Sequence, residues 1–129
     1  MLNKTGVTKV VGAAPVQILF NVQNQFSVGI KVDDANYVTE NGRKIVKAGT
    51  PLSGNLGARE TAFAKATTSS GSSNAVGILL HDVDVTDGDA NGTLLIWGFV
   101  DLNKLDTATT ALITTEVKTA LKGGVTFLK

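Results

Sequence analysis

The sequence lacks cysteine, and this absence excludes several kinds of site. Without thiols the chain forms no disulfides and offers neither thiolate metal ligands nor a cysteine nucleophile. Its 129 residues are still enough for one domain that buries about two-thirds of its unfolded surface, so folding needs no cross-links. The absence of cysteine is also consistent with a reducing compartment.

The chain also lacks an excess of charge of either sign. Twelve basic and eleven acidic residues give a net charge of +1, so there is no global field to attract nucleic acid or a membrane surface. No apolar run approaches the roughly 20 residues of a membrane span. The first twenty residues place a lysine before an apolar stretch, but polar residues and glycine interrupt that stretch. We therefore expect no signal peptide, no membrane partner and no nucleic-acid partner.

Aromatic residues are few, at 5%, whereas glycine, with 14 of 129 residues, exceeds the norm of about 7%. This composition favours strands and tight turns over a helical bundle. Alternation at 25–32 places Phe26, Val28, Ile30 and Val32 on one face of a strand. Further apolar runs predict strands at 16–20, 75–80, 93–100 and 125–128.

One segment has a helical period instead. Residues 109–122 repeat apolar side chains at helical spacing and end at Gly123 and Gly124, so we expect one principal helix there. The polar residues 66–74 predict a flexible surface loop, and residues 1–15 predict a flexible N-terminal arm. The expected fold is a β-rich α+β domain over residues 16–129, with a small mixed or antiparallel sheet.

The stretch GILLHDVDVTDGDANGTLLIWGFVDL, residues 77–102, concentrates the candidate chemistry. Asp87, Asp89 and Asn91, followed by Gly92, match the first six positions of a calcium-binding EF-hand loop. The twelfth position, which should be a bidentate glutamate, is Gly98, and a buried strand replaces the expected helix. The calcium site is therefore a weak candidate, and no metal or cofactor is expected.

His81 with Asp82 and Asp84 is the other candidate, for a metal-dependent enzyme or a hydrolase. One histidine and no cysteine provide few ligands for a metal ion. His81 and Asp82 are also neighbours in a strand, so their side chains point to opposite faces. A connection between two core strands explains the pattern better, because Val83 and Val85 alternate with the acids and the next residues form turns. We expect no catalytic residues and no enzymatic activity.

Two single residues invite a functional interpretation. Trp97 lies in an apolar strand and is expected in the core or at a subunit interface rather than as a platform for a ligand. Lys47, within Val46-Lys47-Ala48, resembles the swinging lysine of lipoyl carriers, but the expected acidic flank is missing.

Four segments in order carry a family resemblance. They are KAGTPLSG at 47–54, NAVGILLHDVDVTDGD at 74–89, GFVDLNKL at 98–105 and ALKGGVTFLK at 120–129. Together they resemble the lambda-type head decoration proteins of tailed bacteriophages, over about residues 42–129. The first forty residues match less well, because this chain has extra apolar strands there.

The resemblance implies a viral structural protein without enzymatic activity. Such proteins bind the exterior of the expanded capsid as homotrimers at three-fold positions, and they stabilise it against packaged DNA. It implies the major capsid protein of the parent phage as partner, the virion as location, and synthesis in the cytoplasm of the host bacterium. An N-terminal arm adds to a capsid strand in this family, and here Thr5, Val7, Val10 and Val11 are the expected contacts.

The alternative is a β-rich binding module of a phage tail, a fibre or a cell surface that recognises glycan or protein. Exposed aromatic platforms would favour it, whereas the aromatic residues here fall mostly in apolar strands.

Overall fold

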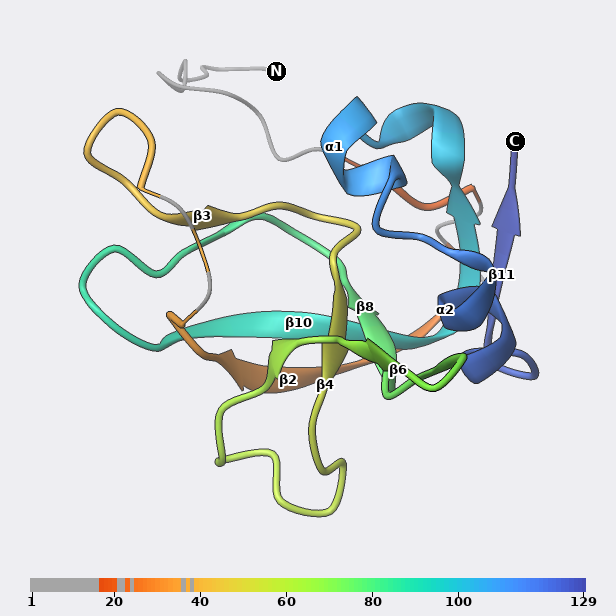
Figure 1. Cartoon of the computed structure of the whole chain (residues 1–129), viewed down its shortest axis with the longest axis horizontal. Helices are drawn as coiled ribbons and strands as arrows, with labels where there is room; N and C mark the ends of the chain where they lie inside the picture. The colour runs from red at the N-terminus through yellow and green to blue at the C-terminus, as the bar shows by residue number, and fades with distance from the viewer. Residues whose placement is uncertain (1–16, 21–22, 24, 36, 38) are drawn as a thin grey trace, which may run out of the picture.

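The computed structural model describes residues 17–20, 23, 25–35, 37 and 39–129. The expected β-rich α+β fold is confirmed (Figure 1). The elements are β2 (Phe26–Val32), β3 (Ile45–Val46), β4 (Pro51–Ser53), β5 (Ala64–Lys65), β6 (Thr68–Ser69), β7 (Ser72–Ser73), β8 (Gly77–Leu79), β9 (Val83–Asp84), β10 (Ala90–Asp101), the 3-10 helix η1 (Leu102–Lys104), α1 (Thr107–Thr110), α2 (Thr115–Ala120) and β11 (Val125–Leu128). The arm residues Thr5, Val7, Val10 and Val11 lie outside the described residues.

Strand β10 organises the main sheet, whose order is β11-β10-β8-β4-β5, with β2 also paired to β10. The pairing of β10 with β11 is parallel, while β2 and β8 pair with β10 in antiparallel fashion, so the sheet is mixed as expected. Residues 18–20 continue along β10 beyond β2: Leu19 forms a bridge with Val100, and the Phe20 amide donates to the Phe99 carbonyl at 2.8 Å.

Both faces of this sheet bury apolar side chains, because neighbouring strand residues point to opposite sides. Leu95 belongs to a core that also contains Ile78 and Val100 and that α2 covers through Val117. Leu94, its neighbour, belongs to a second core on the other face. That core is built mainly from β2, β3, β4, β8 and β9 and includes the fully buried Phe63. Figure 1 shows α1 and α2 gathered with β11 at one end of the molecule, away from the turn before β3.

The prediction of a single helix over residues 109–122 is wrong, because two short helices, α1 and α2, form there instead. Each has its own N-cap. The Asp106 side chain accepts from the Thr109 amide at 2.7 Å, and the Thr114 hydroxyl accepts from the Val117 amide at 3.3 Å. Threonine is a good cap and a poor residue inside a helix, so a second cap at Thr114 starts a new helix. Ile113 and Val117 are still buried, as the apolar spacing predicted.

Residues 66–74 also differ from expectation, because they form a β-hairpin rather than an irregular loop. Strands β6 and β7 pair, and the turn residues Ser70 and Gly71 have φ of 52° and 78°. Two consecutive positive φ values are typical of a type I′ turn, whose twist matches that of the flanking strands. The apolar pattern gave no sign of this hairpin because most of its side chains face solvent.

Candidate functional site

The acidic stretch is a strand and a turn, as the alternation predicted. Val83 and Val85 are buried, whereas Asp82 and Asp84 are exposed. Strand β9 pairs with β3, so both aspartates lie beside the segment that contains Lys47. The turn that follows leads directly into β10.

Asp82 anchors the turn that starts at Lys47. One carboxylate oxygen accepts from the Ala48 amide at 2.7 Å, and the other lies 3.3 Å from the Lys47 ammonium. The Thr50 hydroxyl, which is buried, donates to the Lys47 carbonyl at 2.7 Å and closes the same turn. Asp82 therefore holds backbone in place, and the ion pair of Lys47 gives that lysine a structural partner.

Asp84 makes a second, separate set of bonds. Its carboxylate accepts from the Thr86 hydroxyl and from the Thr86 amide, the latter at 2.9 Å, and it pairs with the Arg43 guanidinium. The bonds from Thr86, followed by those from Arg43, hold the pKa of Asp84 below its ordinary value. A carboxylate held in its ionised form is a poor general acid.

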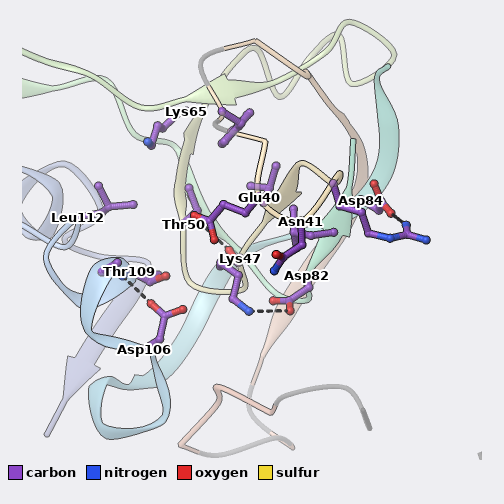
Figure 2. A pocket seen from close by; sticks show the side chains of 15 residues that line it. Glu40, Asn41, Lys47, Thr50, Lys65, Asp82, Asp84, Asp106, Thr109 and Leu112 are labelled. Carbon is purple, nitrogen blue, oxygen red and sulfur yellow. Dashed lines mark hydrogen bonds and ion pairs between the residues drawn. The ribbon is translucent and has the colours of Figure 1, made fainter. Parts of the chain in front are cut away.

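Asp82 and Asp84 line one groove with a volume of about 840 Å³ (Figure 2). Acidic, basic and apolar side chains all line it, and the apolar ones include Ile45 and Leu112. Asp106, on the α1 side of the groove, also has its pKa lowered, because it accepts hydrogen bonds from Thr109. The charged side chains that line the groove are Glu40, Arg43, Lys47, Lys65, Asp82, Asp84 and Asp106.

The hydrolase or metal candidate is not assembled in the part of the chain that the structure describes. His81 is exposed and does not line the groove, although Asp82 and Asp84 do. Each aspartate already has cationic and backbone partners, so no base and carboxylate pair is poised on a nucleophile.

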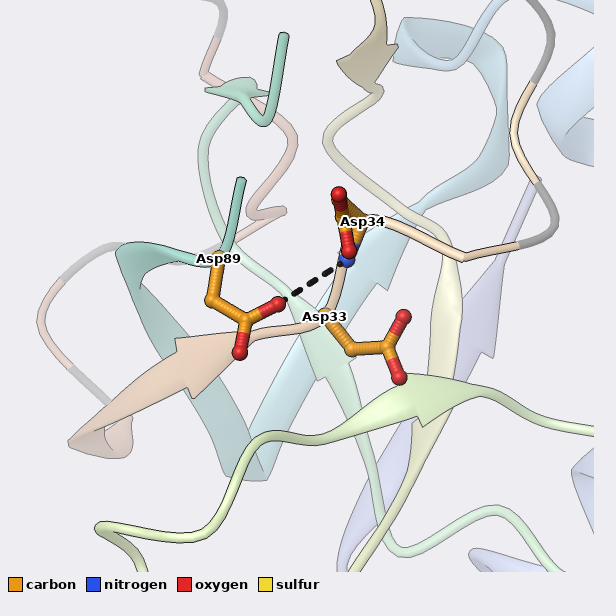
Figure 3. Close-up of side chains that lie close together, drawn as sticks. All are labelled: Asp33, Asp34 and Asp89. Carbon is orange, nitrogen blue, oxygen red and sulfur yellow. Dashed lines mark hydrogen bonds between the residues drawn. The ribbon is translucent and has the colours of Figure 1, made fainter. Parts of the chain in front are cut away.

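One residue of the calcium candidate, Asp89, lies in a cluster with Asp33 and Asp34. Carboxylate oxygens of the three residues lie within 4.8 Å of one another (Figure 3). Asp89 accepts from the Asp34 amide at 3.3 Å, and the Lys44 ammonium lies 3.8 Å from Asp34. A backbone donor and a lysine thus offset the negative charge of this cluster. The spacing of acidic residues along the sequence did not predict that Asp33 and Asp34 lie beside Asp89, because these two residues follow β2 and are far from Asp89 in sequence.

A surface that the sequence did not predict lies on β10. Gly98 and Val100 are buried, so Trp97 and Phe99 point to the opposite face, where their rings meet edge to face at 6.2 Å. Phe26 is the register partner of Trp97. Phe20 is a backbone neighbour of Phe99, because its amide donates to the Phe99 carbonyl at 2.8 Å. We call Phe20, Phe26, Trp97 and Phe99 the aromatic face.

The aromatic face is exposed. The exposed fractions are 59% for Phe20, 58% for Phe26 and 46% for Trp97, and Phe99 is half-buried. Trp97 is therefore not a core residue. Phe26 is exposed, whereas Ile30 and Val32 of the same strand are buried; Phe26 lies beyond the register shift at Leu95/Trp97.

No protein-family model matches the chain, and no curated protein sequence matches it. Within the described residues, no helix is both long and apolar enough to span a membrane.

Proposed function

We propose that this chain is a viral structural protein of tailed bacteriophages, a head decoration protein. It binds the outside of the expanded capsid at three-fold positions as a homotrimer and stabilises the shell against the pressure of packaged DNA. Its partners are the major capsid protein and two further copies of itself, and its place is the exterior of the virion.

One observation carries the proposal: the four segments that resemble this family come together in the fold. Segment 47–54 contains β4, segment 74–89 contains β8 and β9, segment 98–105 begins with the end of β10, and segment 120–129 contains β11. Strands β11, β10, β8 and β4 are consecutive neighbours in the sheet. The resemblance thus follows one continuous structural unit, which supports a shared fold over chance matches of short pieces.

The chemistry of the groove supports a structural role. Asp82 fixes the Lys47 turn, Asp84 pairs with Arg43, and Asp106 caps α1, so all three acids stabilise local structure. A protein that clamps capsid subunits needs such rigidity and apolar contact surface, and it needs no titrating group near neutral pH. The proposal therefore includes neither an enzymatic activity nor a cofactor.

The proposed mechanism assigns capsid binding to residues 1–15, with Thr5, Val7, Val10 and Val11 as strand contacts. Adding a strand to an exposed sheet edge satisfies backbone hydrogen bonds on both partners. Ordering a segment on binding costs entropy, so each arm alone binds modestly. Three linked arms raise the overall affinity without new contacts, and binding only the expanded lattice stabilises that lattice by mass action.

Deleting residues 2–14 tests this mechanism. We expect the truncated chain to keep the urea-unfolding transition of the described domain and to lose co-sedimentation with expanded shells. The matched control replaces Thr5, Val7, Val10 and Val11 by serine in the full-length chain, which keeps the length of the arm and removes its β-branched side chains. Full occupancy of shells by the truncated chain would contradict the role of the arm.

The alternative, a β-rich module that binds glycan or protein, gains support from the aromatic face. Aromatic side chains on an exposed sheet are a common platform for sugar rings, and Trp97 is half-exposed. On a glycan array, this alternative predicts binding that Trp97→Ala abolishes and that Leu56→Ala, at an exposed loop residue, leaves intact. Absence of any glycan signal would leave the decoration function as the better proposal.

A further inference from the structure

Two Asn-Gly pairs occur in this chain, Asn41-Gly42 and Asn91-Gly92. Asparagine is among the chemically labile residues of proteins. A following glycine makes it more reactive, because glycine has no side chain to keep its backbone nitrogen away from the asparagine side chain. The local chemistry is the same at both pairs, so a difference in their reactivity must come from the fold.

Asn41 and Gly42 form the tip of a tight turn, and Asn41 lines the groove (Figure 2). Their φ angles are 54° and 77°, typical of a type I′ turn, and both residues are exposed. The flanking residues Glu40 and Arg43 pair through two backbone hydrogen bonds of 2.7 and 3.0 Å. Among the described residues, the Gly42 amide between them donates to no partner. Nothing lies within 4 Å of the position of a Gly42 Cβ, so the Asn41 side chain has room to reach the Gly42 nitrogen.

The second pair has the opposite surroundings. Asn91 and Gly92 lie in β10, where they are the register partners of Lys31 and Ile30 in β2. Gly92 is also closely packed, since a Cβ there would lie 2.9 Å from Val83 Cγ2. Joining the Asn91 side chain to the Gly92 nitrogen would require the strand to leave its extended, paired form. Such opening is rare in a strand at the centre of a sheet.

We propose that Asn41 is a site of spontaneous deamidation in the native protein, whereas the fold protects Asn91. The Gly42 nitrogen attacks the side-chain carbonyl carbon of Asn41, so a new C–N bond forms and the bond to the side-chain amide nitrogen breaks. That nitrogen leaves as ammonia and takes the proton of the Gly42 amide with it. Water then opens the cyclic imide at either carbonyl and leaves aspartate or isoaspartate at position 41. Water is the only co-reactant, and the inference is independent of the decoration function.

The modification would change both the charge and the geometry of the groove. The new carboxylate lowers the net charge from +1 to zero, in a lining that already contains Arg43 and Lys47. Isoaspartate also adds one carbon atom to the backbone of the turn, so the two hydrogen bonds between Glu40 and Arg43 cannot both keep their geometry. Because the Arg43 guanidinium pairs with Asp84, we expect the change to reach β9 on the same side of the groove.

Incubation of the full-length chain at mildly alkaline pH, followed by peptide mapping with mass spectrometry, tests the inference. In the native protein, the peptide that contains Asn41 should gain the mass difference between a hydroxyl and an amino group. This gain should be at least about tenfold faster than at Asn91, because reaction there requires β10 to open. In concentrated urea, which removes the protection of the sheet, the two peptides should react at similar rates.

Two variants assign the reaction to its residue. Asn41→Gly removes the reacting amide and keeps a residue that accepts positive φ, so it should abolish the mass gain in this peptide. The matched control Asn91→Ser, at the other pair, should leave the native rate at Asn41 unchanged.

A native rate at Asn91 equal to or above that at Asn41 would overturn the inference. So would the absence of a native mass gain at Asn41 when the same peptide reacts in urea, because the turn would then protect its own asparagine. A mass gain of the Asn41 peptide that persists in Asn41→Gly would also contradict it.

Discussion

The packing of β8 against β10 gives a prediction whose size follows from the structure. Gly77 is buried in β8, where a Cβ atom would lie 2.7 Å from Leu94 Cγ and 2.7 Å from the Leu95 carbonyl oxygen. The Leu94 side chain could rotate, but the Leu95 oxygen belongs to the backbone of β10. Gly77→Ala therefore forces β8 and β10 apart in the centre of the sheet.

Forcing one additional methyl group into a packed core typically costs about 1–3 kcal/mol. Because one of the two clashes involves backbone, we expect Gly77→Ala to lower the free energy of unfolding by about 2–3 kcal/mol. Urea denaturation followed by circular dichroism measures this loss as a lower midpoint at an unchanged slope.

Gly29→Ala is the matched control, since Gly29 also lies in a strand but has nothing within 4 Å of its Cβ position. We expect this variant to be as stable as the parent, or more stable by up to about 1 kcal/mol, because alanine restricts the unfolded chain. Equal effects of Gly77→Ala and Gly29→Ala would refute the packing of β8 on β10 described above.

Three further predictions concern pH and local structure. Hydrogen bonds from Thr109 lower the pKa of Asp106, so this carboxylate stabilises the fold above its unfolded pKa near 4, and that stabilisation is lost as pH falls through the folded pKa. Asp106→Ala should therefore lower the free energy of unfolding by about 0.5–1 kcal/mol at neutral pH. The variant should also lose less stability than the parent as the pH is lowered into the acid range. Burial, followed by the charge of Asp33, raises the pKa of Tyr37 to about 12. An absorbance titration of this single tyrosine should show the raised pKa. The contribution of Tyr37 to stability should fall as pH rises from about 10 through 12. Ser70→Asn should raise the thermal midpoint, because asparagine tolerates the positive φ of Ser70 better than serine does; a lower midpoint would argue against the type I′ turn.

The central strands could be predicted from the sequence because their apolar runs have one physical explanation. Ile78, Leu79, Leu94 and Leu95 are fully buried, and a run of neighbouring apolar residues is what a strand covered on both faces requires. The alternation of Asp82 and Asp84 with buried valines is equally unambiguous, since period two occurs only in strands.

The remaining features depend on information that local patterns do not contain. The split between α1 and α2 depends on whether Thr114 caps a helix or lies within one, and both are compatible with the apolar spacing. The cationic partners of Asp82 and Asp84 are Lys47 and Arg43, which flank β3 and lie 35 and 41 positions away in sequence. Strand pairing brings them together, and sequence spacing cannot reveal that pairing. The exposure of Trp97 follows from a register shift and from which face α2 covers, and both are tertiary properties.

The measurement that tests the central claim most directly is co-sedimentation of the full-length chain with undecorated shells of its source phage, before and after expansion. The decoration function predicts binding only after expansion, with saturation near one trimer at each three-fold position. Binding to neither shell, or equal binding to both, would contradict it.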